Sequence, residues 1–311
     1  MTQVWQISGG PSGRPYTAIF LRHGVGLIGP GDPGPWKEGR PDEDYDNSSS
    51  VRRFATEPQQ GDIVLLRAGN SVVRAVGLIA SDYQYLPQFD DVNGWDLQHA
   101  RRIRWSPLPQ DHDFGQAVFG ANARRFGKVD RAEVVDFARR FANSPPTNWQ
   151  TAALPPLPLE EEMLHDIPER LRDVVGLAHD FSQHPFDERV SEDEMIVHLI
   201  APLFRALGWL PEQIAVKWRY VDLALFPHLP RKPENCWLIV EAKYPGVGAE
   251  GALDQAKRYA QELNIRRDIL VSDGFRYRLY AVEQDYQPVA YANLIRLKRS
   301  ALELFNRLKR P

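Results

Sequence analysis

The chain has 311 residues, 43% of them hydrophobic and 25% charged, and a formal net charge of −3. These values are typical of a globular protein and exclude a disordered, collagen-like or coiled-coil chain, and the length suits two domains. No apolar run approaches the roughly 18 residues that span a bilayer, and the first residues do not resemble a signal peptide, so we expect a cytoplasmic protein. The single cysteine, Cys236, excludes an intrachain disulfide and a cysteine-based zinc site.

The first 110 residues predict short strands separated by turns rich in glycine and proline. We expect strands at residues 4–7, 17–20, 62–66, 71–79 and 100–105, with residues 62–79 forming a hairpin around the turn at 68–70. The Gly/Pro-rich residues 24–40 indicate a strand edge followed by a loop, and the acidic stretch 42–50 indicates an exposed segment. A helix is expected at 130–142. Short strands with such turns are typical of a small β-barrel.

The second half of the chain alternates helices and strands. The proline-rich stretch 143–158 predicts a linker, followed by one or two helices over 159–182. Beyond it we expect helices at 191–207, 252–263 and 299–309, and strands at 215–226, 236–243, 268–272 and 276–282. This order is typical of an α/β domain. We therefore predict a β-barrel domain over 1–143, a linker with connecting helices over 144–185, and an α/β domain over 186–311.

Two apolar strands carry the strongest chemical signal. Residues two apart in a strand face the same side, so Glu241 and Lys243 project together. If the strand containing Asp222 is the antiparallel neighbour, its carboxylate lies beside Glu241. Two carboxylates and an ammonium are costly to bury together unless a cation binds them, and Mg²⁺ takes carboxylate oxygens. The competing interpretation is a set of ordinary salt bridges at the strand ends, with Lys243 as the partner.

An Asp followed by Glu-x-Lys at the end of an apolar strand resembles the PD-(D/E)xK nuclease superfamily. Residues 190–282 resemble more closely the nuclease domain at the N-terminus of type I restriction motor subunits. The matching elements are Glu192 followed by Pro202-Leu203 and Leu207-Gly208-Trp209, then Asp222, Glu241-x-Lys243, Gln255-x-x-x-Tyr259, and the turn Ser272-Asp273-Gly274. The proline that often precedes the first Asp is absent, since Tyr220-Val221 stands there.

The resemblance implies roles for these residues. Asp222 and Glu241 would be ligands of Mg²⁺ or Mn²⁺, and Lys243 would position the attacking water or stabilise charge on the phosphate. Gln255 would approach the site from its helix. Glu192 would support the metal shell in preference to Glu194, because Glu192 shares a helical stripe with Ile196, Leu199 and Leu203.

The first half resembles, over about 120 residues, the EVE and PUA-like barrel domains that bind nucleic acids. The resemblance rests on Val4-Trp5-Gln6-Ile7, Gly61-Asp62-Ile63-Val64, Val76-Gly77-Leu78-Ile79-Ala80 and a strand containing Trp105. It implies a reader of modified bases, and a flipped base needs flat aromatic walls. The candidate walls are Trp36, Tyr83, Tyr85, Trp95 and Trp5, of which Trp5 sits on a strand, where a tryptophan is more often a core residue. Candidate contacts to the DNA backbone are Arg22, Arg52, Arg53, Arg102 and Arg104, with a solvated face as the alternative.

Together the two resemblances imply a modification-dependent, type IV-like restriction endonuclease acting in phage defence. The sequence lacks GxxxxGK[ST], so we expect no ATP-driven motor in this chain and cleavage near the recognised base. The expected partner is double-stranded DNA carrying a modified base, and a double-strand break would call for a homodimer or two binding events. The alternatives are a non-cleaving sensor of modified nucleic acid and a nuclease directed at RNA.

Overall fold

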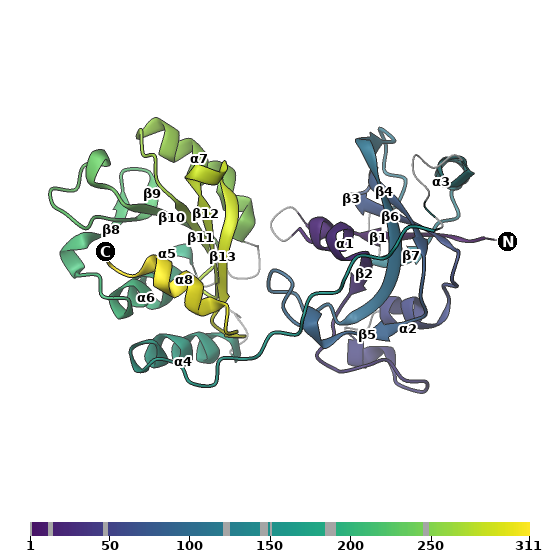
Figure 1. The fold of residues 1–311 in the computed structure, drawn as a ribbon, viewed down its shortest axis with the longest axis horizontal. Coiled ribbons are helices and arrows are strands. Elements are labelled where there is room, and N and C mark those ends of the chain that lie inside the picture. The colour runs from purple at the N-terminus through teal and green to yellow at the C-terminus, as the bar shows by residue number, and fades with distance from the viewer. Residues whose placement is uncertain are drawn as a thin grey trace. The chain divides into compact units, whose positions relative to one another are not determined.

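The computed structural model describes residues 2–11, 15–45, 49–120, 125–143, 149, 151–183, 191–244 and 249–311. Their contacts divide the chain into two compact units, one reaching Glu160 and the other spanning Glu161–Pro311. Both units combine a β-sheet with helices, and Figure 1 shows the two sheets with their own helices. None of the helices in these ranges combines the length and the apolar character needed to cross a membrane.

The first unit is built on a mixed sheet that curls into a half-barrel, with the strand order β2-β6-β4-β3-β1-β7 and with β5 paired to β6. Its strands are β1 (Val4–Ser8), β2 (Val25–Ile28), β3 (Ile63–Ala68), β4 (Val72–Ile79), β5 (Gln84–Tyr85), β6 (His99–Asp113) and β7 (Phe126–Lys128). Its helices are α1 (Thr17–His23), α2 (Ser49–Thr56) and α3 (Ala132–Asn143). Strands β1 and β3 run parallel, and the other pairs are antiparallel. Apolar clusters cover both faces of the sheet.

The structure confirms several predicted elements of this unit and corrects others. The β3–β4 hairpin, the strand at 100–105 within β6, and the helix α3 lie where the sequence predicts them. The predicted strand at 17–20 is wrong, because these residues begin helix α1, which buries Phe20 and ends at Gly24 in the left-handed conformation. In the segment 42–50, predicted to be exposed, Glu43 and Asp44 are exposed, whereas Tyr45 and Ser50 are buried, and residues 46–48 lie outside the described residues.

The proline-rich stretch after α3 lies against the first unit over residues 151–157. The Arg104 Nε atom donates to the Ala152 carbonyl at 3.1 Å, and Arg102 donates to the Pro155 carbonyl. His23 contacts the Pro156 carbonyl at 3.0 Å. A bridge between Met163 and Lys298 then places the chain in the second unit. Residues 151–157 of the predicted linker at 143–158 are therefore held by the first unit, and its residues 144–148 and 150 lie outside the described part of the chain.

The second unit is built on a sheet of strand order β13-β12-β11-β10-β9-β8, in which only the described pair β10–β11 is parallel. Its strands are β8 (Ile214–Trp218), β9 (Val221–Leu225), β10 (Leu238–Ala242), β11 (Ile269–Ser272), β12 (Arg276–Ala281) and β13 (Gln287–Asn293). Its helices are α4 (Glu169–Gln183), α5 (Glu192–Met195), α6 (Ala201–Ala206), α7 (Leu253–Glu262) and α8 (Ala301–Leu308). The crossover between the parallel strands contains α7, as such a connection requires.

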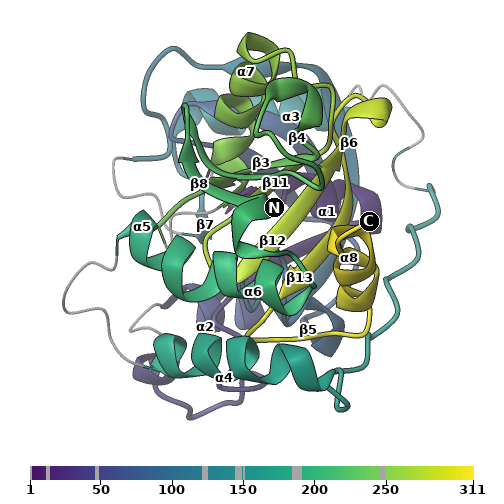
Figure 2. The ribbon, with the colours of Figure 1, turned by 90° about the vertical axis from the view of Figure 1, so that its left-hand side faces the viewer.

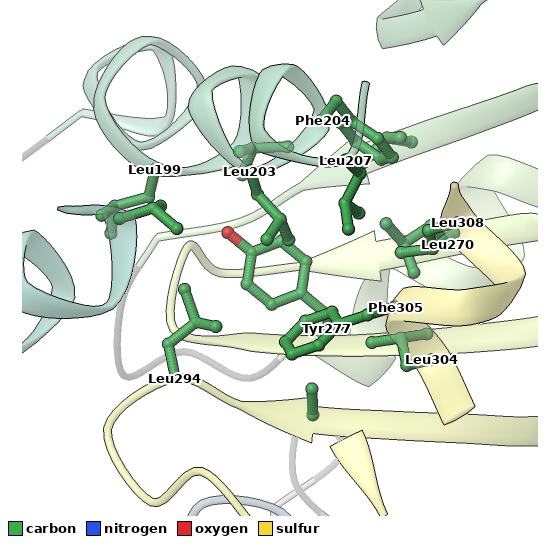
Figure 3. Close-up of a cluster of buried hydrophobic side chains, with 14 of the residues drawn as sticks. Leu199, Leu203, Phe204, Leu207, Leu270, Tyr277, Leu294, Leu304, Phe305 and Leu308 are labelled. Atoms are coloured by element: carbon green, nitrogen blue, oxygen red, sulfur yellow. The ribbon is translucent and has the colours of Figure 1, made fainter. Parts of the chain in front are cut away.

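Helices cover both faces of this sheet. One face packs against α4, α6 and α8, which Figure 2 shows in front of the strands. Figure 3 shows the Tyr277 ring of β12 among leucines of these helices. The other face packs against α7 through small residues such as Ala256 and Ala260. The sheet is therefore a rigid platform, and a side chain at the end of a central strand is held by packing on both sides.

Most predicted elements of the second unit are present. The helix predicted at 191–207 is a continuous helical stretch in which a π-helical segment, Ile196–Ile200, joins α5 to α6. The predicted strands at 215–226 form the antiparallel pair β8–β9. Strand β13 was not predicted from the sequence. It pairs with β12 through a register shift at Leu279/Tyr280 and contains Pro288.

Candidate active site

Pairing of β9 with β10 brings Asp222 beside Glu241. The two strands are antiparallel, and their register places Leu223 opposite Val240. Asp222 directly precedes Leu223, and its Oδ2 atom accepts a hydrogen bond from the backbone N–H of Ala242 at 2.7 Å. Both carboxylates are buried, and the Glu241 side chain is only 2% exposed. The predicted juxtaposition of the two acidic residues is confirmed.

Lys243 projects from the end of β10 to the same place. Its Nζ lies 3.5 Å from Glu241 Oε1 and 4.0 Å from Glu192 Oε1. The backbone N–H of Lys243 donates to the Ser272 carbonyl at 2.9 Å, so the parallel neighbour β11 fixes the residue just beyond the strand end. An acidic pair and a lysine therefore share one site at the end of the two central strands.

The first turn of α5 places the two candidate glutamates, Glu192 and Glu194, in different surroundings. Ser191 caps the helix: its Oγ accepts from the Glu194 N–H at 3.1 Å, and Glu194 returns a carboxylate oxygen to the Ser191 N–H at 2.6 Å. Glu194 is thus used in the capping box. Glu192 points toward Lys243, and burial raises the pKa of its carboxyl, against the lowering effect of Lys243.

Glu241 carries the largest electrostatic cost in the site. Burial, followed by the proximity of Asp222, raises its pKa from 4.5 to about 8, although Lys243 acts in the opposite direction. Its Oε2 atom is buried and has no hydrogen-bond partner in the described part of the chain. A buried carboxylate oxygen with no donor is unusual in a native structure. Two buried carboxylates, one with an oxygen that lacks a donor, are the kind of ligands that a hard divalent cation takes.

Two further charged residues, which the sequence did not indicate, complete the cluster. Lys217 of β8 donates to Asp222 Oδ1 at 2.7 Å and lies 2.9 Å from Asp193 Oδ1. Hydrogen bonds to the two aspartates outweigh the effect of burial and raise the pKa of Lys217. Across the described ranges, no three acidic, histidine or cysteine side chains are arranged so that they could together hold a metal ion. Lys217 reaches Asp222 because the strands β8 and β9 that carry them are paired, which the residue type of Lys217 alone did not indicate.

Gln255 lies on α7, on the sheet face that also carries Glu241. Its Nε2 donates to the hydroxyl of Tyr259 at 3.1 Å, and the Tyr259 ring packs 6.0 Å from the ring of Tyr220. Among the described residues its hydrogen-bond partner is therefore Tyr259 rather than a carboxylate. Its predicted approach to the acidic pair stays a prediction.

The first unit contains an aromatic cluster centred on a histidine that the sequence did not single out. The Tyr83 hydroxyl lies 2.8 Å from His99 Nδ1 and accepts a hydrogen bond from the backbone N–H of Trp36 at 2.9 Å. His99 Nε2 lies 2.7 Å from the Pro30 carbonyl, so Nε2 carries the proton and Nδ1 accepts from Tyr83. The Tyr85 ring stands edge-on to His99 at 5.6 Å. Burial lowers the pKa of His99 to about 4, which keeps the ring neutral.

The indole nitrogen of Trp36 is the unsatisfied polar atom of this aromatic cluster. Its indole Nε1 is buried and has no hydrogen-bond partner among the residues described. Trp36, Tyr83 and Trp95 pack against the edge of the core, whereas Trp5 is fully buried, stacks on Phe126 and donates from Nε1 to Asp62 at 2.9 Å. Trp5 is therefore a core residue and presents no face to a ligand.

The candidate backbone-contacting arginines are mostly engaged within the protein. Arg102 and Arg104 donate to backbone carbonyls of Gly24, Pro155 and Ala152, so both side chains are held within the first unit, and their predicted contact with DNA stays a prediction. Arg52 and Arg53 form surface ion pairs with Asp42 and Glu57, each at 3.2 Å. Arg22 is exposed on α1.

Comparisons with known proteins assign no family to the whole chain. Residues 35–124 match the model of a domain of unknown function, DUF8426, and this range includes the aromatic cluster. No curated protein matches. A solved fragment described as an HsdR subunit of a type I restriction enzyme from Vibrio vulnificus YJ016 is 17% identical, with a TM-score of 0.27. The match covers 39% of this chain and 26% of that one, and a score this low does not establish a shared fold.

Proposed function

We propose that the second unit is a divalent-metal-dependent nuclease that hydrolyses phosphodiester bonds in DNA. The observation that carries this proposal is the buried acidic pair Asp222 and Glu241, with Lys243 at 3.5 Å and an unpartnered oxygen on Glu241. A structural salt bridge would satisfy its carboxylate, because an ionised group buried without full compensation destabilises the fold. The incomplete satisfaction of Glu241 instead supports a site built to receive a cation.

The residues of the site divide the chemistry among them. Asp222 and Glu241 would hold Mg²⁺ or Mn²⁺, which supplies positive charge against the scissile phosphate. Lys243 is long enough to donate a hydrogen bond to the attacking water or to a phosphate oxygen beside the pair. Glu192, at 4.0 Å from the Lys243 ammonium, keeps that ammonium oriented. Burial at the strand ends excludes bulk water and strengthens each of these interactions.

Cleavage assays with matched variants test this assignment. Asp222→Asn, Glu241→Gln and Lys243→Met should each reduce Mg²⁺-dependent cleavage by about a thousandfold, as losses of groups acting in the transition state do. Glu234→Gln removes an exposed carboxylate of the same unit and should cleave like the unchanged protein. Cleavage retained by Asp222→Asn would refute the proposed centre.

We further propose that the first unit reads a modified base through the cluster of Trp36, Tyr83, Tyr85 and His99. Aromatic rings stack on a flipped base, and a few polar groups then read its edge. The unpartnered Trp36 Nε1 is such a group, and His99, whose two ring nitrogens are already engaged, holds the Tyr83 hydroxyl in place beside it. This arrangement supports base reading but does not select a modification.

Digestion of matched DNAs tests the reader. The substrates are one unmodified amplified DNA and versions carrying 5-methyl-, 5-hydroxymethyl-, glucosylated or N4-methylcytosine, or N6-methyladenine. Cleavage of one modified set alone would support the reader and name the base, and Trp36→Ala should abolish that selectivity. Equal cleavage of all sets would leave the nuclease and refute the reader. Binding without cleavage would favour a sensor, and cleavage confined to RNA would change the substrate class.

A further inference from the structure

Lys217 occupies an unusual position at the edge of the acidic site. Its ammonium lies between two carboxylates, 2.7 Å from Asp222 Oδ1 and 2.9 Å from Asp193 Oδ1. Its backbone adopts a left-handed conformation, with φ of 50°, and Arg219 two residues later has φ of 55°. Non-glycine residues rarely adopt this conformation, and such strain concentrates at functional sites. The β8–β9 hairpin therefore holds the lysine side chain over Asp222 in a backbone geometry that lysine does not favour.

The ammonium occupies one of the carboxylate oxygens that a metal ion would need. Lys217 holds Asp222 Oδ1, and the Ala242 N–H holds Asp222 Oδ2. Glu241 Oε2 is left unpartnered in the described part of the chain. In this arrangement the described acidic side chains do not form a group of three around one metal position. The Lys217 ammonium thus contacts Asp193 and Asp222, while the buried Glu241 Oε2 lacks a partner among the described residues.

We infer that Lys217 is an internal cation that competes with the divalent metal for Asp222, and that metal binding requires the ammonium to leave Asp222. The inference rests on the proposed nuclease function, because it presumes that Asp222 and Glu241 bind a metal. The Lys217 side chain is half exposed and Asp193 is 71% exposed, so the ammonium has room to move outward. It keeps Asp193 as its partner after Asp222 is released. Lys217 is then a positioning residue that sets the metal concentration at which the site becomes competent.

Calorimetric titration of the full chain with Mn²⁺ tests the competition without relying on cleavage. Removing a close competing charge should strengthen binding, so Lys217→Met is expected to bind Mn²⁺ about tenfold more tightly than the unchanged protein. Lys217→Arg restores the charge and should return the affinity toward that of the unchanged protein. Lys232→Met removes an exposed lysine of the same unit and should leave the affinity unchanged.

A second variant keeps the test informative if Lys217→Met does not fold. Asp193→Asn alters an exposed side chain and weakens the outer hold on Lys217. Without the Asp193 carboxylate, Lys217 should spend more time paired with Asp222, so the affinity for Mn²⁺ should weaken severalfold. Loss of affinity in Lys217→Met, or no change in either variant, would overturn the inference.

The titration also separates this inference from the proposed function. If the unchanged protein binds Mn²⁺ and Asp222→Asn does not, the metal site stands, and the lysine variants alone decide the inference. If none of these proteins binds Mn²⁺, the metal-dependent function fails and the inference fails with it.

Discussion

Replacing Glu241 with glutamine should make the metal-free protein more stable at alkaline pH. Burial raises the pKa of this carboxyl from 4.5 to about 8, so the folded protein holds a proton that the unfolded chain releases. The stabilisation is complete below pH 4.5 and is lost as the pH rises to about 8. Glutamine has the same shape and no charge, so the variant should not show this loss.

The magnitude follows from the pKa change. At roughly 1.4 kcal/mol per tenfold change in proton affinity, a rise from 4.5 to about 8 corresponds to about 5 kcal/mol. Local relaxation and partial hydration reduce the effect of burial on real carboxylates. We therefore expect Glu241→Gln to exceed the unchanged protein by about 2–3 kcal/mol at pH 8.5, and to match it near pH 5.

Urea unfolding at a series of pH values, with chelator present, measures the difference directly. Taking the difference between the two proteins cancels the titration of other groups, His99 among them. Adding Mg²⁺ or Mn²⁺ at pH 8.5 should raise the free energy of unfolding of the unchanged protein and should not change that of the variant. The reasoning is refuted if Glu241→Gln is the less stable protein at pH 8.5, or if the difference does not depend on pH.

Three other predictions test the two units separately. His99, whose pKa burial lowers from 6.5 to about 4, should give nitrogen NMR shifts of a neutral ring protonated at Nε2 at pH 5.5, and a charged ring there would contradict the hydrogen-bond assignment. Asp62→Ala removes the acceptor of Trp5 Nε1 and of two backbone N–H groups, so urea unfolding should show a loss of about 3 kcal/mol; a loss below about 1 kcal/mol would be inconsistent with these bonds. Gly274→Ala places a Cβ 2.7 Å from Met195 Sδ at φ of +85° and should lower the melting temperature, whereas Gly176→Ala on α4, with open space around it, should raise it.

The sequence predicted the acidic pair because strand geometry is local and regular. Alternation placed Glu241 and Lys243 on one side, and an antiparallel neighbour was enough to bring Asp222 beside them. Helical periodicity likewise favoured Glu192 over Glu194, since Ile196, Leu199 and Leu203 are all buried. These relations depend on spacing along the chain and on burial of apolar residues, both of which a sequence displays.

The missed features depend on contacts between distant segments. Arg102 alternated with apolar neighbours as a DNA-facing residue would, yet its partner is a carbonyl of Pro155, 53 residues away. Thr17–His23 is rich in residues that favour strands, and tertiary packing of Phe20 overrides that preference. The left-handed backbone of Lys217 has no signature in its residue type. Trp5 and Trp36 are the same residue type, and only the structure shows that Trp5 is a core residue and Trp36 a candidate ligand contact.

The contacts of residues 151–157 determine where the chain can be divided experimentally. A fragment ending at residue 143 would remove the Pro155 and Ala152 carbonyls that accept from Arg102 and Arg104 and would uncover part of β6, so it should aggregate or fold poorly. A fragment ending near Glu160 keeps them. Leu159 is 92% exposed, so limited chymotrypsin digestion should cut there before it cuts within 151–157. The two fragments released by that cut can be assayed separately, the first for binding of modified DNA and the second for cleavage.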